Sequence, residues 1–201
     1  MLTLPITPTD MAERPARERI LLTAHDLFYR HGIRAVGIDR VIAEAGVTKV
    51  TLYRHFPSKD DLIRAFLALR HERWMAWFRD ALARHQASIA ALVGAPASPW
   101  AALVPTLREW FESPLFRGCA FINSVAELGG ALPEVLTLAA AHKRDMVDAL
   151  ADLLPAAAPN RLARAQAVAL VVDGAIVRAQ SGPDGVQEAL SGVQCIVDII
   201  V

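Results

Sequence analysis

Residues 38–56 read IDRVIAEAGVTKVTLYRHF, and this stretch decides what the rest of the chain can be. Apolar residues recur at spacings of three and four on both sides of Gly46, which predicts two short amphipathic helices joined by a tight turn. Glycine suits such a turn because its backbone adopts conformations that are costly for other residues. Two short helices joined at a glycine-containing turn are typical of the helix-turn-helix arrangement.

The second helix of this pair, from about residue 48 to residue 55, has one apolar and one polar face. Val47, Leu52 and Phe56 can pack inward onto the preceding helices. The outward face carries short hydroxyls, cations and an aromatic ring: Thr48, Lys49, Thr51, Tyr53, Arg54 and His55. Such a helix matches the major groove of DNA in width and chemistry. The alternative is an ordinary helical hairpin whose polar residues are merely solvated.

Working outward from this stretch, the same spacing predicts an all-α fold. An irregular, proline-containing segment at residues 1–14 is expected to be a flexible arm. The expected helices are 15–31, 38–45, 48–55, 58–86, 100–112, 119–128, 133–154, 161–180 and 185–200. Gly- and Pro-rich segments at 94–99 and 155–159 separate some of them.

Composition excludes several classes of protein. The 201 residues are 54% hydrophobic and 21% charged, which favours a globular chain over a disordered one. Two cysteines are too few for a disulfide scaffold, so we expect a reduced, cytoplasmic protein. No secretory signal is visible at the N-terminus, and Gly and Pro interrupt the longest uncharged run, so we expect no membrane association.

The zero net charge conceals an uneven distribution of charge along the chain. Residues 1–59 carry nine Lys or Arg against six Asp or Glu, whereas residues 60–201 carry twelve against fifteen. A basic head on an acidic body suits a protein that contacts phosphates at one end. Most such imbalances are only solvated surface, so the distribution supports DNA binding weakly.

Residues 27–62, LFYRHGIRAVGIDRVIAEAGVTKVTLYRHFPSKDDL, closely resemble the N-terminal DNA-binding region of the TetR/AcrR family of transcriptional regulators. The match covers roughly residues 15–65, and the remainder resembles the family only in architecture. The resemblance implies a helix-turn-helix DNA-binding domain at residues 15–60 and a ligand-binding and dimerisation domain at residues 61–201.

The resemblance also implies roles for individual residues at the DNA. Residues expected near bases are Thr48, Lys49, Val50 and Thr51; residues expected on bases or phosphates are Tyr53, Arg54 and His55. Lys59 is expected to grip a phosphate. Many members carry a threonine before the second helix, where it caps the helix and touches a phosphate. Gly37 occupies that position here and has no side chain for the contact.

By the same resemblance the protein is a homodimeric repressor that binds a palindromic operator in double-stranded DNA and is released by a small molecule. The two C-terminal helices would form a four-helix bundle with their mates. Their spacing fits such a seam, with Val186, Leu190, Val193, Val197 and Ile200 in the last helix and the small residues Ala167, Ala175 and Ala179 before it. A core within one chain predicts the same stripe.

The effector site is the least specified part of the sequence. Aromatic residues that could line it are Trp74, Phe78, Trp110 and Phe121; polar residues among apolar neighbours are Asn123, Glu127, His142 and Asp173. Buried polar groups need a partner, so these positions either bond internally or bind a ligand. For the aromatic residues an ordinary core is the simpler interpretation, and for Asp173 a bond within the dimer.

Three alternatives stay open. Cys119 follows a cation at Arg117, which can make a thiol reactive, and some relatives sense oxidants or electrophiles by cysteine. A helical adaptor that has lost DNA binding would retain the C-terminal helices but lack the DNA-contacting residues of the N-terminal region. An enzyme is disfavoured because no nucleophile motif, phosphate loop or metal-ligand spacing appears, so we expect no metal and no cofactor.

Overall fold

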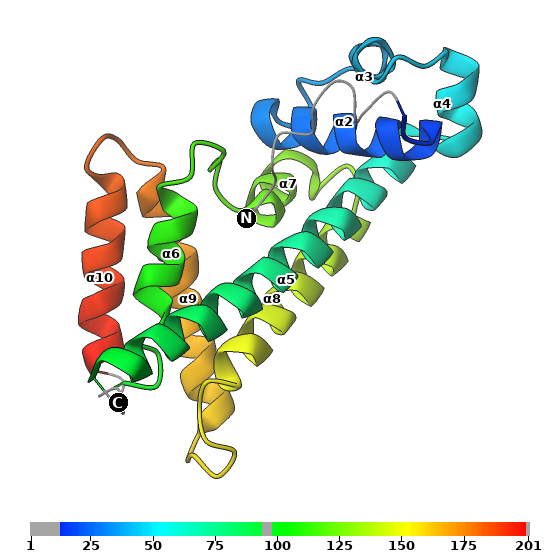
Figure 1. The fold of residues 1–201 in the computed structure, drawn as a ribbon. Helices are drawn as coiled ribbons and strands as arrows, with labels where there is room; N and C mark the ends of the chain where they lie inside the picture. Colours follow the sequence, from blue (N-terminus) through cyan, green and yellow to red (C-terminus); the bar gives the residue numbers. More distant parts are fainter. Residues whose placement is uncertain (1–12, 94–97, 200–201) are drawn as a thin grey trace. The chain divides into compact units, whose positions relative to one another are not determined.

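The computed structural model describes residues 13–93 and 98–199, and all regular secondary structure in these ranges is helical (Figure 1). The helices are α2 (Ala16–His31), α3 (Ile38–Ala45), α4 (Lys49–His55), α5 (Lys59–Val93), α6 (Leu103–Phe111), α7 (Ala120–Leu128), α8 (Glu134–Ala151), α9 (Arg161–Ala179) and α10 (Gly185–Ile199). The expected all-α class is therefore confirmed. Residues 1–12 of the expected arm lie outside the described ranges. None of the helices in the described ranges could span a membrane.

Three helix ends differ from the expected ones. Helix α5 continues to Val93 instead of ending near Gln86, because the chain between them is rich in alanine and contains no helix-breaking residue. Helix α6 begins at Leu103 instead of Trp100, since the preceding residues form turns of the i→i+3 type. Helix α8 ends at Ala151, where similar turns lead into Pro155.

The chain divides into two compact units. The first runs up to Trp74 and includes Cys119–Ala139, so it contains α2, α3, α4, α7 and the beginnings of α5 and α8. The second contains Met75–Gly118 and Ala140–Val201, with α6, α9, α10 and the remaining parts of α5 and α8. Helix α7 and the beginning of α8 thus belong to the same unit as the helix-turn-helix. The expected division at residues 15–60 and 61–201 describes functional domains and stays a prediction.

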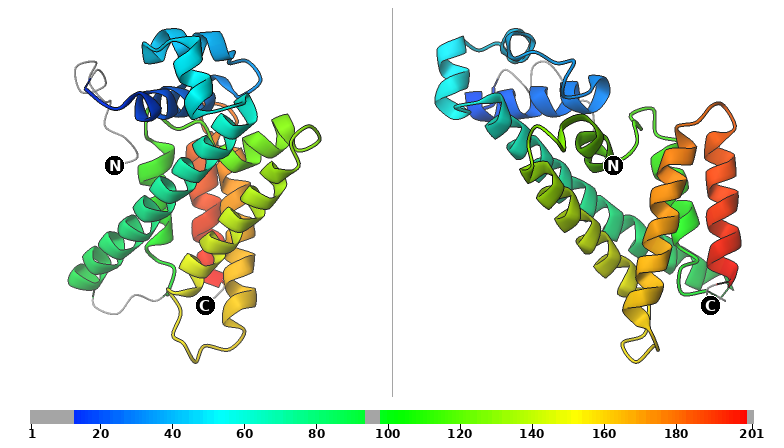
Figure 2. Two further views of the ribbon diagram at one scale, coloured as in Figure 1. Left: turned by 90° about the vertical axis from the view of Figure 1, so that its right-hand side faces the viewer. Right: turned by 180° about the vertical axis from the view of Figure 1, so that it is seen from behind.

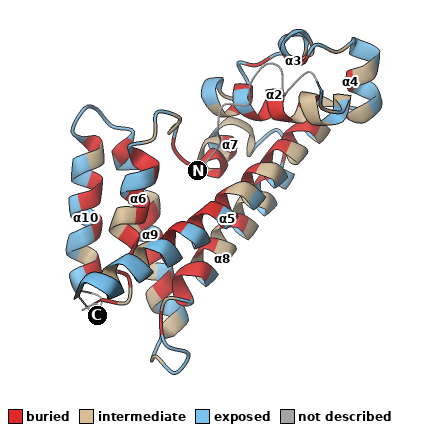
Figure 3. Ribbon diagram, viewed as in Figure 1, coloured by how far each residue is buried: buried red, intermediate tan, exposed pale blue. Residues whose placement is uncertain are grey.

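The first unit is built around the apolar face of α2. Ile20, Ala24 and Phe28 of α2 are buried, and Leu52 and Phe56 from the α4 region are buried as well. Figure 3 shows buried residues along α2. Helices α3 and α4 both pack against α2. This core holds α4 by its apolar side, so that the opposite side is left at the surface.

The second unit contains the helical pair α9 and α10, which lie side by side and connect through a short turn (Figure 2). The seam expected to face a second subunit is buried within one chain. Its members Leu190, Val193 and Val197 are almost completely buried, and α10 packs on both α9 and α6. Ala175 and Ala179 of α9 are buried as well. Burial within one chain contradicts the intersubunit assignment of Leu190, Val193, Val197, Ala175 and Ala179; a core stripe and a dimer stripe have the same periodicity. Val186 and Ala167 are half-buried, and Ile200 lies outside the described residues.

Candidate nucleic-acid interface

Helix α4 presents a polar face with one apolar side chain in its middle. Lys49, Tyr53 and Arg54 are exposed, and Val50 is 79% exposed. Thr48 is also exposed, whereas Thr51 and His55 are half-buried. The structure therefore places the predicted DNA-contacting residues of α4 on or beside one accessible surface.

The beginning of α4 is held by hydroxyl groups. Thr48 is the N-cap, and its Oγ1 accepts a hydrogen bond from the Thr51 amide at 3.2 Å. The hydroxyls of Thr48 and Thr51 are also hydrogen-bonded to each other at 2.9 Å. Thr48 and Thr51 were predicted to lie near DNA bases. Their hydroxyl groups already have partners within the protein, and these bonds stabilise the beginning of α4.

Two arginines of α2, which the sequence pattern did not single out, position the helix pair. Arg19 donates to the carbonyl oxygens of Ala45 and Gly46 at 3.2 Å and 3.3 Å, at the turn between α3 and α4. Gly46 has a φ of 61°, a left-handed conformation that favours glycine. The guanidinium of Arg17 lies 5.2 Å from the centre of the Phe56 ring. In the sequence, only their positive charge in the basic N-terminal part of the chain could have drawn attention to these two residues.

Lys59 is the first residue of α5, and its side chain forms a hydrogen bond within the first unit. Its Nζ donates to the carbonyl oxygen of Ile33 at 2.7 Å and lies 5.9 Å from the centre of the Phe28 ring. Partial burial lowers the pKa of Lys59, and the carboxylates of Glu127 and Asp60 oppose this shift. An ammonium group has three N–H donors, so the bond to Ile33 leaves donors for a phosphate. The predicted phosphate contact stays a prediction.

Glu127 of α7 holds the turn between α2 and α3. Its Oε2 accepts a hydrogen bond from the Arg34 amide at 2.8 Å. A Cβ placed on Gly32 would lie 3.2 Å and 3.3 Å from the two carboxylate oxygens, and Gly32 has a φ of 84°. Gly32 therefore allows the carboxylate a close approach to the turn. The sequence suggested Glu127 as a ligand-binding residue, and the structure gives it this bond within the first unit.

The other candidate effector residues are divided between the two units. Trp74, Phe121 and Asn123 belong to the first unit with Glu127, whereas the second contains Phe78, Trp110, His142 and Asp173. The four aromatic residues and His142 are buried, and Asn123 is half-buried. Asp173, for which a bond within the dimer was expected, forms an ion pair with Lys143 of its own chain. Each unit therefore contains four of the eight predicted residues.

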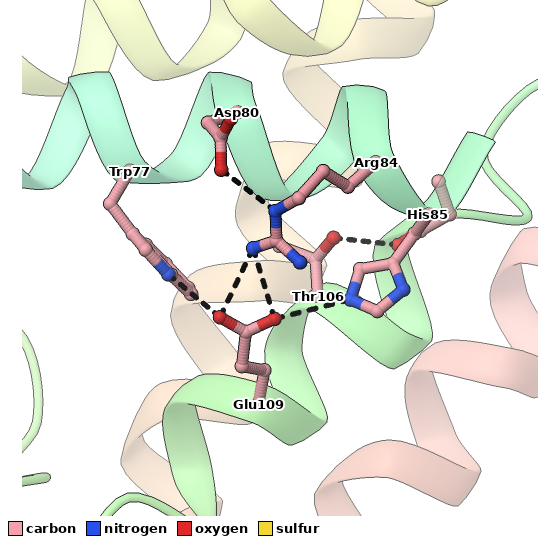
Figure 4. Close-up of polar contacts among 7 residues, drawn as sticks. Trp77, Asp80, Arg84, His85, Thr106 and Glu109 are labelled. Carbon is pink, nitrogen blue, oxygen red and sulfur yellow. Dashed lines mark hydrogen bonds and ion pairs between the residues drawn. The ribbon is translucent and has the colours of Figure 1, made fainter. Parts of the chain in front are cut away.

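A polar network joins α5 and α6 in the second unit and was not foreseen (Figure 4). Glu109 accepts hydrogen bonds from Trp77 Nε1 at 3.0 Å and from Arg84 at 3.2 Å, and it lies 3.3 Å from His85 Nε2. Burial raises the pKa of Glu109, but the bonds from Trp77 and Arg84 outweigh it and lower the pKa overall. Arg84 also donates a hydrogen bond to Asp80, four residues earlier on α5. This i,i+4 spacing of opposite charges is the one part of the network that can be seen in the sequence.

The first unit contains a buried arginine and a buried histidine. Arg70 is buried, with its guanidinium 3.8 Å from the centre of the Tyr29 ring. His25 is 6% exposed, and its Nε2 has no hydrogen-bond partner among the described residues. Burial, followed by repulsion from Arg70 and Arg73, lowers the pKa of His25 to about 3. His25 is therefore neutral in the folded protein at physiological pH.

The two thiols differ in accessibility. Cys119 is the N-cap residue of α7 and is 4% exposed, while Cys195 in α10 is exposed. Burial slows any reaction of Cys119 with a reagent in solvent. Among the described residues, no group of three or more His, Cys, Asp or Glu side chains is placed to hold a metal ion.

Comparisons with known proteins match the same segment. The sequence model "Bacterial regulatory proteins, tetR family" matches residues 20–66. The HTH-type transcriptional regulator UidR of Escherichia coli (strain K12) is 34% identical over 67 residues, 33% of this chain and 34% of UidR. The HTH-type transcriptional activator FasR of Mycolicibacterium smegmatis is 36% identical over 66 residues, 33% of this chain and 30% of FasR. The chain thus aligns with about a third of the length of these curated relatives.

Solved structures extend the similarity over nearly the whole chain. SCO4454, a TetR-family transcriptional regulator from Streptomyces coelicolor, has a TM-score of 0.73 and 32% identity, with 92% of this chain and 95% of that chain covered. The reduced form of NemR from E. coli, at 19% identity and a TM-score of 0.71 over 90% of this chain and 97% of NemR, shares the fold.

The helix-turn-helix and the all-helical body define a DNA-binding transcriptional regulator. The chain belongs to the TetR family of transcriptional regulators. Proteins of this family regulate transcription and are not enzymes, which confirms the non-enzymatic assignment.

Proposed function

We propose that this protein is a ligand-responsive repressor that binds a palindromic operator as a homodimer and is released by a small molecule. The outward face of α4 carries the proposal, because its apolar side is buried in the first unit while Lys49, Tyr53 and Arg54 are exposed. Inserted in the major groove, the cations reach guanine edges or phosphates, and the tyrosine ring contacts a base or the backbone. His55 and Lys59 contact the flanking backbone.

The DNA-binding role is tested by truncating one exposed side chain of α4. Arg54→Ala weakens binding to a selected operator by about 1–3 kcal/mol, because a charged contact to a base or phosphate is lost. Arg108→Ala is the matched control, since Arg108 is an exposed arginine of α6 in the other unit. Fluorescence anisotropy at two salt concentrations measures the loss, and circular dichroism verifies folding. Equal affinity of Arg54→Ala and the wild type would move the interface away from α4.

An exposed apolar stripe on α9 and one exposed apolar residue on α10 support a homodimer. Leu170 is 74% exposed, and Val177 and Ile199 are also exposed. Gly174 lies between Leu170 and Val177 on α9, and Gly192 lies two turns before Ile199 on α10. A Cβ at either glycine would meet no atom within 4 Å, so the surface around both is open. Exposed apolar stripes of this kind mark protein interfaces. A second copy of the chain covers them by two-fold symmetry, which in turn requires a palindromic operator with half-sites about one helical turn apart.

The dimer is tested by introducing charge into this surface. Leu170→Glu converts the dimer to a monomer in sedimentation velocity, because two carboxylates would be buried at a symmetric interface. Leu92→Glu is the control: Leu92 is 85% exposed near the end of α5, and its replacement leaves the dimer intact. A Leu170→Glu protein that stays dimeric would exclude this surface.

The effector response is tested on the complex with operator DNA. Compounds are screened for release of the labelled operator, and Asn123→Ala, at a half-buried position of α7, reduces the release without weakening DNA binding. A reporter gene behind the operator gives the sign of regulation. A repressor lowers the reporter signal until the effector is added, whereas a rise on binding would make the protein an activator, as the name of FasR states for that relative.

A further inference from the structure

Val50 is an anomaly on the surface of α4. It is a β-branched apolar residue that is 79% exposed, on a helix of seven residues whose other exposed side chains are polar. An isopropyl group in that position contributes almost nothing to the core, which is filled from the other side by Leu52 and Phe56. Its exposure therefore has no explanation in the packing of the first unit.

The position of Val50 relative to its neighbours indicates what it faces. Tyr53 and Arg54 follow it by three and four residues, so the three side chains lie on one face of the helix. The nearby hydroxyls of Thr48 and Thr51 are bonded to each other, and that of Thr48 also accepts a hydrogen bond from the Thr51 amide. Val50 is thus a central apolar point on the face proposed to enter the major groove.

B-DNA offers one matching group in that groove. The C5-methyl of thymine is the apolar element of the base-pair code there, whereas the other three bases present hydrogen-bond donors and acceptors. We propose that Val50 packs against a thymine methyl in each half-site and makes thymine the required base at that position. This inference rests on the proposed insertion of α4 into the major groove. A stiff β-branched side chain suits the contact because little rotamer freedom is lost on binding.

The test removes the methyl group from the DNA and the side chain from the protein. An operator is first selected from random DNA with the full-length wild-type chain. Each thymine is then replaced singly by deoxyuridine, which keeps the base pair but lacks the C5-methyl. At one position per half-site the wild type loses about fourfold in affinity, the value of one buried methyl-sized group. Val50→Ala binds the thymine and deoxyuridine operators equally at that position.

Two controls separate Val50 from its surroundings. Thr51→Ser deletes a methyl group from the adjacent residue but keeps the hydroxyl that bonds to Thr48, so loss of the deoxyuridine effect in this variant would assign the methyl contact to Thr51. Leu92→Ala removes an equally exposed apolar side chain elsewhere and retains the wild-type deoxyuridine profile. Thermal denaturation verifies that each variant is folded before its affinity is compared.

The outcomes distinguish a failure of DNA binding from a failure of the contact between Val50 and thymine. If the wild type selects no DNA, the proposed function is overturned and this inference with it. If it selects an operator in which no thymine methyl matters, the inference about Val50 is overturned while DNA binding stands. The same holds if Val50→Ala keeps the fourfold loss, or if Thr51→Ser abolishes it, because another residue then reads the methyl.

Discussion

His25 makes the stability of the first unit sensitive to mild acid. Its ring is buried in α2, edge-on to the Phe66 ring at 5.6 Å, and its folded pKa is about 3. An unfolded chain has a histidine pKa near 6.5, so below that pH the unfolded state takes up a proton that the folded state cannot. Stability is therefore fully present above pH 6.5 and is lost as the pH falls towards 3.

The size of the loss follows from the pKa difference. Each pH unit between the two pKa values is worth about 1.4 kcal/mol, so the decrease from pH 6.5 to pH 5.0 is about 2 kcal/mol. That is a large fraction of the free energy of unfolding of an ordinary domain. His25→Leu abolishes this component, and it also removes a buried Nε2 that has no partner among the described residues.

The assay is urea denaturation of the DNA-free protein at several pH values from 7.5 to 5.0, at one protein concentration. The difference in free energy of unfolding between wild type and His25→Leu changes by about 2 kcal/mol over this range, in favour of the variant at low pH. His31→Gln is the control, because His31 is an exposed histidine at the end of the same helix. A pH-independent difference for His25→Leu would refute the buried, neutral state of His25.

Three further predictions concern the first unit. Gly37→Thr raises the free energy of unfolding by about 1 kcal/mol in thermal or chemical denaturation, because the position is extended (φ −78°), a Cβ meets no atom within 4 Å, and the hydroxyl caps α3. Glu127→Ala accelerates hydrogen exchange at the Arg34 amide, whose acceptor is lost, and lowers stability by about 1–3 kcal/mol. Cys119→Ser leaves the effect of oxidants on DNA binding unchanged, because the thiol is buried; loss of an oxidant response in this variant would establish thiol sensing.

The sequence was sufficient for the local part of the fold. Gly46 and Thr48 mark the end of α3 and the beginning of α4 by backbone conformation and capping, which are local properties, and both ends lie within one residue of those expected. The end of α5 was misplaced because alanine-rich sequence carries a high helix propensity but no stop signal before Gly94.

The sequence was less informative about partners that are distant along the chain. Glu127 and Arg34 are 93 residues apart, and Lys59 and Ile33 are 26 apart. The acceptor for Lys59 is a backbone carbonyl, so no residue type signals it. A glutamate among apolar neighbours indicates only that some partner is needed. That one partner is a turn of the helix-turn-helix region depends on the packing of α7.

The C-terminal helices show why periodicity does not identify a partner. A helix that packs within its own chain and also meets a second subunit needs two apolar stripes. In α10 the first contains Leu190, Val193 and Val197, which are buried, while Ile199 is exposed on another side. In α9, Ala175 is buried and Leu170 is exposed. The hydrophobic effect is non-directional, so the spacing of the first stripe fits either interface equally well. Burial within the single chain assigns that stripe to the core and leaves the second for a partner, which is why Leu170 and not Val193 is the residue to charge in testing the dimer.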